Sequence, residues 1–163
     1  LKFPRGRMDL INLSNKDMCY IDYAHTPEAL ETSLIELKHA YKDHKLWCIF
    51  GCGGERDKEK RPKMGKIAES LSDLLVVTSD NPRSEDALDI IKDIKKGIEN
   101  YKNVKFIESR KKAISYCLNK IKTSGKKNVL LISGKGHEDY QDILGEKIYF
   151  SDYEEVKDFL KDV

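Results

Sequence analysis

Few cysteines, balanced charge and the lack of a long apolar run restrict the classes of protein that this sequence can encode. The 4 cysteines lie in apolar surroundings without paired CxxC spacing, so neither a disulfide framework nor a zinc site is expected. Lys plus Arg number 30 and Asp plus Glu 28, and a formal net charge of +2 argues against nucleic acid as a partner. No apolar run approaches the roughly 20 residues that cross a bilayer, and no stretch is typical of a secretory signal. We therefore expect a soluble, cytoplasmic protein with no membrane partner.

The length of 163 residues favours one compact domain, residues 1–163, which we expect to be a monomer. No internal repeat or low-complexity tract interrupts it. The chain opens at Leu1 with no initiator methionine, which suggests a piece of a longer protein.

Apolar runs alternate with segments of helical spacing along the whole chain. The runs at residues 18–22, 46–50, 74–78, 104–107 and 129–133 are too continuous for half-exposed strands and indicate strands buried on both faces. Helical spacing occurs at residues 30–41, 64–71, 87–98 and 114–121. The order predicts an α/β fold, a Rossmann-like, doubly wound and mostly parallel sheet with helices on both faces.

Local signals predict the ends of several elements. Thr26 and Ser84 are expected to cap helices, the first beginning at Pro27 and the second carrying Glu85 and Asp86 in its first turn. Ser151, followed at capping-box spacing by a glutamate, is expected to cap a last helix. Residues 8–13 are expected to pair antiparallel with residues 18–23, and a further strand is expected at 147–150, after a turn near Gly145.

Polar and glycine-rich tracts follow four of the predicted strands directly. They are DYAH at residues 22–25, GCGGERD at 51–57, DNPR at 80–83 and GKGHE at 134–138. In a doubly wound sheet all four would gather at the carboxyl edge, where such folds bind ligands. Residues 51–54 expose amide donors suited to a phosphate or carboxylate, but the chain lacks the GxGxxG and GxxxxGK[ST] patterns, so it encodes no complete ATP site.

The charged residues of these tracts suit a zwitterionic ligand. Arg56 and Arg83 could each hold a carboxylate through two parallel hydrogen bonds, and Asp80 and Glu138 could grip an ammonium group beside the amide of Asn81. Each also has a structural interpretation, as a solvated charge for the arginines and as a cap or turn residue for the carboxylates.

Other polar residues leave two interpretations open. His25 and His137 could contact phosphate, transfer a proton or bind a metal, or they could be packed residues. Lys135 could touch phosphate or be solvated. Arg61 is expected to fix a loop, and Arg110 has no motif around it.

Taken together, the tracts resemble the C-terminal domain of the UDP-N-acetylmuramoyl-L-alanyl-D-glutamate 2,6-diaminopimelate ligase family of Mur ligases. The resemblance rests on DYAHTP at residues 22–27, FGCGG at 50–54 with RDK at 56–58 and KRP at 60–62, DNPR at 80–83 and GKGHEDYQ at 134–141. It runs from Gly6 almost to the end of the chain. Four motifs in order are far more specific than any one of them.

The resemblance implies an enzyme with two further domains, an N-terminal one for the UDP group and a central one for ATP and Mg²⁺. It implies that the domain represented here binds meso-diaminopimelate and supplies no catalytic residue and no metal ligand. By motif, the diaminopimelate-binding residues would be Arg56, Asp80, Asn81, Arg83, Gly134 and Glu138. Arg7, Asp22 and His25 would approach the nucleotide.

The resemblance also implies an order of preference among substrates. The arginine of DNPR is the family's diaminopimelate form, because lysine lacks the second carboxylate that would pair with it. Ligases that add lysine, lanthionine, D-alanyl-D-alanine or glutamate are the alternatives within the enzyme class, and the DNPR and GKGHEDYQ tracts argue against most of them. A non-catalytic module that binds an anionic metabolite is the alternative from another class.

Overall fold

The computed structural model describes residues 7–162; residues 1–6, which include the Leu1 start on which the expectation of a longer protein rested, and residue 163 lie outside this range. In chain order the elements are β1 (Asp9–Asn12), β2 (Met18–Asp22), α1 (Pro27–Ala40), β3 (Lys45–Phe50), α2 (Lys60–Leu71), β4 (Leu74–Val77), α3 (Ala87–Lys95), β5 (Val104–Phe106), α4 (Arg110–Thr123), β6 (Asn128–Ser133), β7 (Tyr140–Ile143), β8 (Glu146–Tyr149) and α5 (Asp152–Lys161).

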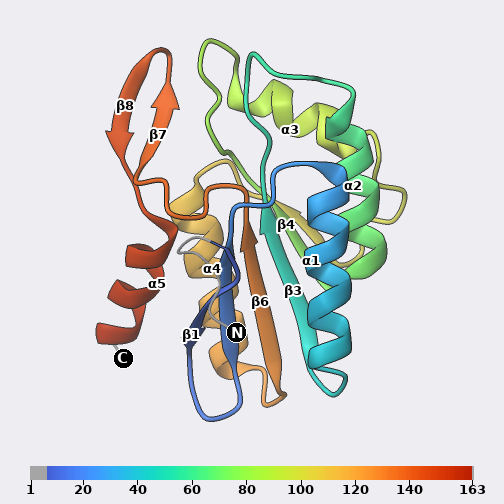
Figure 1. The fold of residues 1–163 in the computed structure, drawn as a ribbon, viewed down its shortest axis with the longest axis vertical. Coiled ribbons are helices and arrows are strands. Elements are labelled where there is room, and N and C mark those ends of the chain that lie inside the picture. The colour runs from blue at the N-terminus through green and yellow to red at the C-terminus, as the bar shows by residue number, and fades with distance from the viewer. Residues whose placement is uncertain (1–6, 163) are drawn as a thin grey trace.

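Among residues 7–162, six strands form one sheet in the order β1-β2-β6-β3-β4-β5, in which only β1 runs antiparallel to its neighbour. Helices α1, α2 and α3 pack on one face and α4 and α5 on the other, so the sheet has a core on each side (Figure 1). The central strand β6 is buried along its whole length, as its continuous apolar run predicts. The predicted doubly wound α/β fold is confirmed.

Most of the predicted element ends are confirmed. Thr26 caps α1, its hydroxyl accepting from the backbone N–H of Ala29 at 3.2 Å, and Pro27 is the first helical residue. Ser151 caps α5 in the same way through the N–H of Glu154. The antiparallel pairing of β1 with β2 places Ile11 opposite Cys19.

One predicted helix cap is wrong, and one predicted strand has a partner that the sequence did not indicate. The cap of α3 is Asp86, whose carboxylate accepts from the N–H of Leu88 at 2.8 Å, and not Ser84, whose hydroxyl donates instead to Glu55. The strand expected at 147–150 is β8, and it pairs with β7, a strand that the sequence did not indicate. These two strands form a hairpin apart from the main sheet, at the end where the parallel strands finish (Figure 1).

Within residues 7–162, no helix is both long and apolar enough to cross a membrane. All 4 cysteines are buried free thiols.

Candidate functional site

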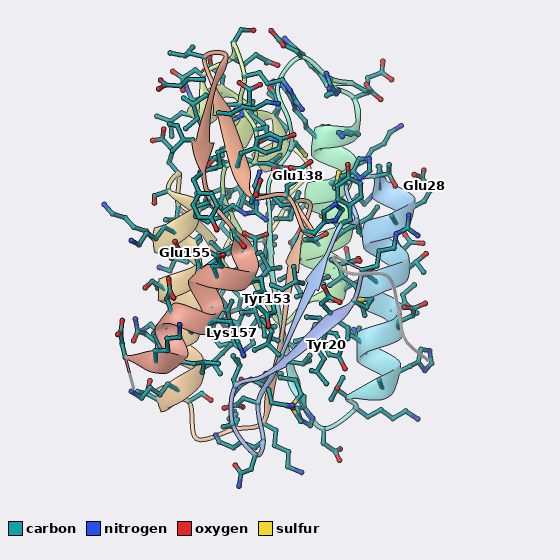
Figure 2. The ribbon with its side chains drawn as sticks, turned by 60° about the vertical axis from the view of Figure 1, so that its left-hand side comes forward. Tyr20, Glu28, Glu138, Tyr153, Glu155 and Lys157 are labelled. Carbon is teal, nitrogen blue, oxygen red and sulfur yellow. The ribbon has the colours of Figure 1, made fainter. Side chains whose placement is uncertain are left out.

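The four polar tracts meet at the carboxyl edge of the sheet around a cleft of about 540 Å³. All six residues proposed from the motifs to bind diaminopimelate line it: Arg56, Asp80, Asn81, Arg83, Gly134 and Glu138. The first turn of α1 adds Glu28, and Figure 2 shows Glu28 and Glu138 at the same end of the molecule, with Tyr20 farther down the sheet. Tyr23, Lys60 and Lys63 also line the cleft; the first two belong to the quoted motifs, but the sequence assigned none of the three a role in binding.

The glycines after β3 allow two loops to touch through their backbones. A Cβ on Gly51 would lie 2.3 Å from the carbonyl oxygen of Thr78, and one on Gly54 would lie 1.9 Å from that of Pro82. The N–H of Gly54 donates to the carbonyl of Asn81 at 2.8 Å. The glycine-rich loop therefore packs directly on the DNPR loop, which only residues without a side chain permit.

Arg83 is held in a backbone conformation that is unusual for a residue with a side chain, with φ of 53°. Its N–H donates to the carbonyl of Asp142 at 2.8 Å, and its carbonyl accepts from Leu144 at 2.7 Å, so the β7–β8 hairpin fixes it from both sides. Its guanidinium Nη1 donates to the carbonyl of Gly54 at 2.9 Å. The guanidinium therefore lies across the two loops, at the wall of the cleft.

Arg56 directly follows the glycine-rich loop and is exposed, and a Cβ on Gly53 would meet both its Cγ, at 3.7 Å, and Nη1 of Arg83, at 2.7 Å. Its Nη1 donates to the carbonyl of Glu55 at 3.0 Å, a bond within its own loop. Its position gives the cleft a second guanidinium, one that is less firmly held than that of Arg83.

The two carboxylates of the cleft share a partner that the sequence did not indicate. Lys135 is fully buried, and its Nζ lies 3.2 Å from Asp80 Oδ1, 3.4 Å from Glu138 Oε1 and 2.9 Å from Asn81 Oδ1. The interpretation of Lys135 as a solvated side chain is therefore wrong. The sequence did carry a signal for an ion pair here, because Lys135 stands between two glycines and is followed at i+3 by a glutamate, Glu138.

Arg61 connects the glycine-rich loop with α3, which agrees with the loop-fixing role expected for it. Its buried guanidinium donates to the carbonyl of Gly53 at 3.0 Å, to Glu85 Oε2 at 2.9 Å and to Asp93 Oδ2 at 3.0 Å. Hydrogen bonds from Arg61 and from the N–H of Glu55 lower the pKa of Glu85 to about 2. The loop that carries Arg56 is thus fastened to the helix that follows Arg83.

Arg110, for which the sequence offered no motif, forms a fully buried ion pair with Asp152 at the start of α5. Its Nε and Nη2 each lie 2.8 Å from a carboxylate oxygen of Asp152, and the guanidinium also donates to the carbonyls of Ser79 and Ser133 at 3.1 Å. Those serines directly precede Asp80 and Gly134. One guanidinium therefore ties together the strand ends that carry two walls of the cleft.

The three residues expected near the nucleotide, Arg7, Asp22 and His25, line a second depression, of about 440 Å³. It shares Tyr23, His25 and Thr26 with the main cleft, so the two are neighbours. Asp22 is buried and accepts from Ser33 Oγ at 2.7 Å, whereas Arg7 and His25 are exposed. His137 is exposed as well, and its ring is tilted by 30° to that of Tyr23 with 6.3 Å between the ring centroids.

The cleft does not offer the groups that metal binding or thiol catalysis would use. Within the described part of the chain, no group of three or more His, Cys, Asp or Glu side chains could hold a metal ion. Burial raises the pKa of the Cys52 thiol, at the floor of the cleft, to about 12, so it is not a nucleophile at neutral pH. The arrangement of guanidinium and carboxylate groups suits the binding and orientation of a ligand that carries charges of both signs.

Comparison with known proteins gives a consistent result. Residues 6–136 match the sequence family described as "Mur ligase, glutamate ligase domain". A UDP-N-acetylmuramoyl-L-alanyl-D-glutamate–2,6-diaminopimelate ligase from Haemophilus influenzae is 46% identical over 99% of the chain, and one from Prochlorococcus marinus is 48% identical over 96%. A solved structure of a ligase with the same name superposes with a TM-score of 0.85 at 37% identity, over 99% of the chain.

The chain spans only about a third of each of these proteins: 32% and 31% of the two curated relatives and 32% of the solved chain. The family match covers every residue that lines the cleft except Glu138, and the superposition covers 99% of the chain. The chain therefore belongs to the Mur ligase family.

Proposed function

We propose that this chain is the amino-acid-binding, carboxyl-terminal domain of an ATP-dependent ligase that adds meso-diaminopimelate to UDP-N-acetylmuramoyl-L-alanyl-D-glutamate, a step in peptidoglycan synthesis. The observation that carries the proposal is that two arginines and two carboxylates, from three loops, line one cleft at the carboxyl edge of the sheet. Relatives at 46% and 48% identity bear the name of that ligase.

The charges of the cleft match those of diaminopimelate, which carries two carboxylates and two amino groups. In the proposed complex Arg83 and Arg56 pair with a carboxylate of the ligand, and Asp80 and Glu138 accept from an ammonium group. Asn81 and the backbone of Gly134 complete the wall between them. Lysine has no second carboxylate, so its binding would leave guanidinium donors without a partner.

The size of this discrimination follows from the hydrogen bonds that lysine cannot make. A hydrogen bond to a charged group contributes about 1.5 to 3 kcal/mol, which corresponds to roughly 10- to 100-fold in affinity. Lanthionine presents the same charges as diaminopimelate and is the competing substrate within this proposal.

ATP and Mg²⁺ would be bound mainly outside this chain. Residues 7–162 contain no cluster of potential metal ligands, and the glycine-rich loop at 51–54 lacks the lysine and hydroxyl side chain of a phosphate loop. We therefore propose that residues 1–163 are part of a longer protein, in which the UDP-binding and ATP-binding domains come before this domain. In such a ligase the acceptor carboxyl is activated by phosphorylation elsewhere, and this domain presents the amine for attack.

Arg7, Asp22 and His25 are proposed to face the nucleotide when the domains close. The depression that they line adjoins the amino-acid cleft, which is the geometry required if the amine is to approach an activated carboxyl. Asp22 would act mainly by fixing the loop, since its carboxylate accepts from Ser33 and from the N–H of Met8.

The test is ATP-dependent incorporation of meso-diaminopimelate and of lysine by a ligase that ends in this chain. Arg83→Ala should raise the KM for diaminopimelate about 10- to 100-fold and leave the KM for ATP within about twofold. Arg83 also bonds to Gly54, so a loosened loop has to be separated from a lost ligand contact.

The ratio of kcat/KM for diaminopimelate to that for lysine makes this separation. A lost carboxylate contact lowers the ratio, whereas a loosened loop lowers both values together. Preference of the unaltered ligase for lysine would refute the proposed substrate. A chain that binds an anionic metabolite but supports no ligase activity in the longer protein would support the non-catalytic alternative. The chain alone is expected to be inactive.

A further inference from the structure

Lys135 is a buried cation behind the wall of the cleft, in contact with the lining residues Asp80, Asn81 and Glu138. Its side chain is fully shielded from water, and Lys135 is not one of the six residues proposed from the motifs to bind the ligand. An ammonium group without water is costly unless carboxylates or other acceptors surround it. Its partners therefore indicate what it does.

Those partners come from two loops that are far apart in the sequence. Asp80 and Asn81 follow β4, whereas Glu138 belongs to the loop after β6, three residues beyond Lys135 itself. The ring of Tyr140, with its centroid 5.6 Å from Nζ, closes one side of the group. The ammonium thus joins the two carboxylates that the proposed function assigns to the ligand.

Lys135 occupies one oxygen of each carboxylate and leaves the other free. It contacts Asp80 Oδ1 and Glu138 Oε1, and Asn81 Nδ2 also donates to Glu138 Oε1 at 3.2 Å. Across residues 7–162, no hydrogen bond is made to Asp80 Oδ2 or to Glu138 Oε2, and both residues line the cleft. The lysine therefore orients two acceptor oxygens for a third group.

The formal charges of the cluster set the charge of that group. Two carboxylates and one ammonium sum to −1, so one further ammonium neutralises the cluster. Without Lys135 the sum would be −2, and the two carboxylates would repel each other.

We propose that Lys135 is a positioning residue of the amino-acid site. It holds Asp80 and Glu138 together, turns one oxygen of each toward the ligand, and balances the cluster so that it accepts a single ammonium group. This inference rests on the proposed function, since it concerns the amino-acid ligand of the same cleft.

A purely structural role for Lys135 is the competing explanation, and other bonds already fulfil that role. The N–H groups of Gly134 and Gly136 donate to the carbonyl of Asp22 at 3.0 and 3.2 Å. On the other side, Gln141 Nε2 donates to the carbonyl of Asp80 at 2.7 Å. Both loops are therefore anchored through their backbones, and the distinctive effect of Lys135 falls on the carboxylates.

The experiment replaces Lys135 by methionine in the ligase that ends in this chain and compares two substrates. Diaminopimelate carries an ammonium group at each end, and 2-aminopimelate lacks one of them. Lys135→Met should raise the KM for diaminopimelate at least about tenfold and leave the KM for ATP within about twofold. The preference for diaminopimelate over 2-aminopimelate should fall at least about fivefold, because the second ammonium loses its oriented acceptors.

Lys16→Met is the matched control. Lys16 also pairs with a carboxylate, that of Asp17 at 3.9 Å, and with the carbonyl of Lys126 at 2.8 Å, but it lies in the turn between β1 and β2, away from the cleft. It should leave both KM values and the preference unchanged. If Lys135→Met does not fold, Lys135→Arg carries the test, because arginine keeps the charge but not the compact ammonium geometry.

The outcomes separate this inference from the proposed function. If the unaltered ligase does not add diaminopimelate, the proposed function fails and the inference with it. If it does, but the folded Lys135 variant shows the same substrate preference as Lys16→Met, only the role of Lys135 is refuted. An equal loss for both substrates would also refute it, because a structural role predicts that pattern.

Discussion

Replacing Gly54 by alanine should separate the two loops that carry Arg56 and Arg83. The new Cβ would lie 1.9 Å from the carbonyl oxygen of Pro82, which is backbone and cannot turn away. Real Cβ atoms stay at least 3.0 Å from such atoms, so the loops must part by about 1.1 Å (3.0 − 1.9). The φ of Gly54 is not in the left-handed region, so the effect is steric rather than conformational.

The expected cost follows from the bonds that such a shift breaks. The N–H of Gly54 donates to Asn81 at 2.8 Å, and Arg83 Nη1 donates to the carbonyl of Gly54 at 2.9 Å. A neutral bond contributes about 0.5 to 1.5 kcal/mol and a charge-assisted one about 1.5 to 3, so unfolding becomes easier by about 2 to 4 kcal/mol. At 2 to 4 °C per kcal/mol for a domain of this size, the Tm should fall by roughly 4 to 16 °C.

The consequence for binding should be larger than the consequence for folding. A displacement of about 1 Å in a positioning group can cost on the order of a hundredfold in rate, so kcat/KM for diaminopimelate should fall far more than the loss of folded protein explains. Thermal denaturation and steady-state kinetics of the Gly54→Ala ligase measure the two effects.

Gly65→Ala provides the matched control for this steric effect. A Cβ there would lie 2.4 Å from the carbonyl oxygen of Ile94, between α2 and α3, and Gly65 does not line the cleft. It should lower the Tm comparably and leave the KM for diaminopimelate nearly unchanged. Unchanged Tm and kinetics for Gly54→Ala, or equal kinetic losses in the two variants, would refute the reasoning.

Two further predictions concern the ion pairs behind the cleft. Arg110→Met should lower the free energy of unfolding by about 3 to 5 kcal/mol in chemical denaturation, because it leaves the carboxylate of Asp152 buried without a cation; a loss below 1 kcal/mol would contradict this. The lowered pKa of Glu85 predicts stability that is complete above its ordinary value of 4.5 and lost as the pH falls toward about 2. The stability difference between the unaltered chain and Glu85→Gln should therefore shrink from pH 5 to pH 2.5, and a constant difference would argue against a folded-state pKa near 2.

The fold could be predicted from the sequence because its buried strands are continuously apolar, whereas the loops that follow them are polar and rich in glycine. Strand β6 is buried on both faces and is apolar throughout, and the GKGHE tract begins directly after it. Parallel strands end at the same edge, so four such tracts had to converge. That convergence depends on topology alone, which is why the lining of the cleft was predictable without any distance.

The contacts inside the cleft were not predictable by the same route. Lys135 looks like a surface lysine in sequence, and only the packing of two loops shows that three acceptors surround it. The cap of α3 was misplaced by two residues, because Ser84 and Asp86 are both favoured at caps and the neighbouring Glu55 captures the serine hydroxyl. Strand β7 carries few apolar residues and is only half-buried, so it lacks the signal that marked the core strands.

The missed strand bears directly on the proposed selection of diaminopimelate by the DNPR motif. The backbone conformation of Arg83, with φ of 53°, costs a non-glycine residue about 1 to 2 kcal/mol. Nothing in the other three residues of the motif offsets this cost. The two backbone bonds from Asp142 and Leu144 do offset it, and both residues belong to the β7–β8 hairpin or its turn. The direction of the Arg83 side chain is thus set by a segment some 60 residues later in the chain (142 − 83 = 59). If DNPR alone is introduced into a ligase with a different hairpin, the arginine is present but is not oriented. We expect that such a ligase does not acquire the preference for diaminopimelate.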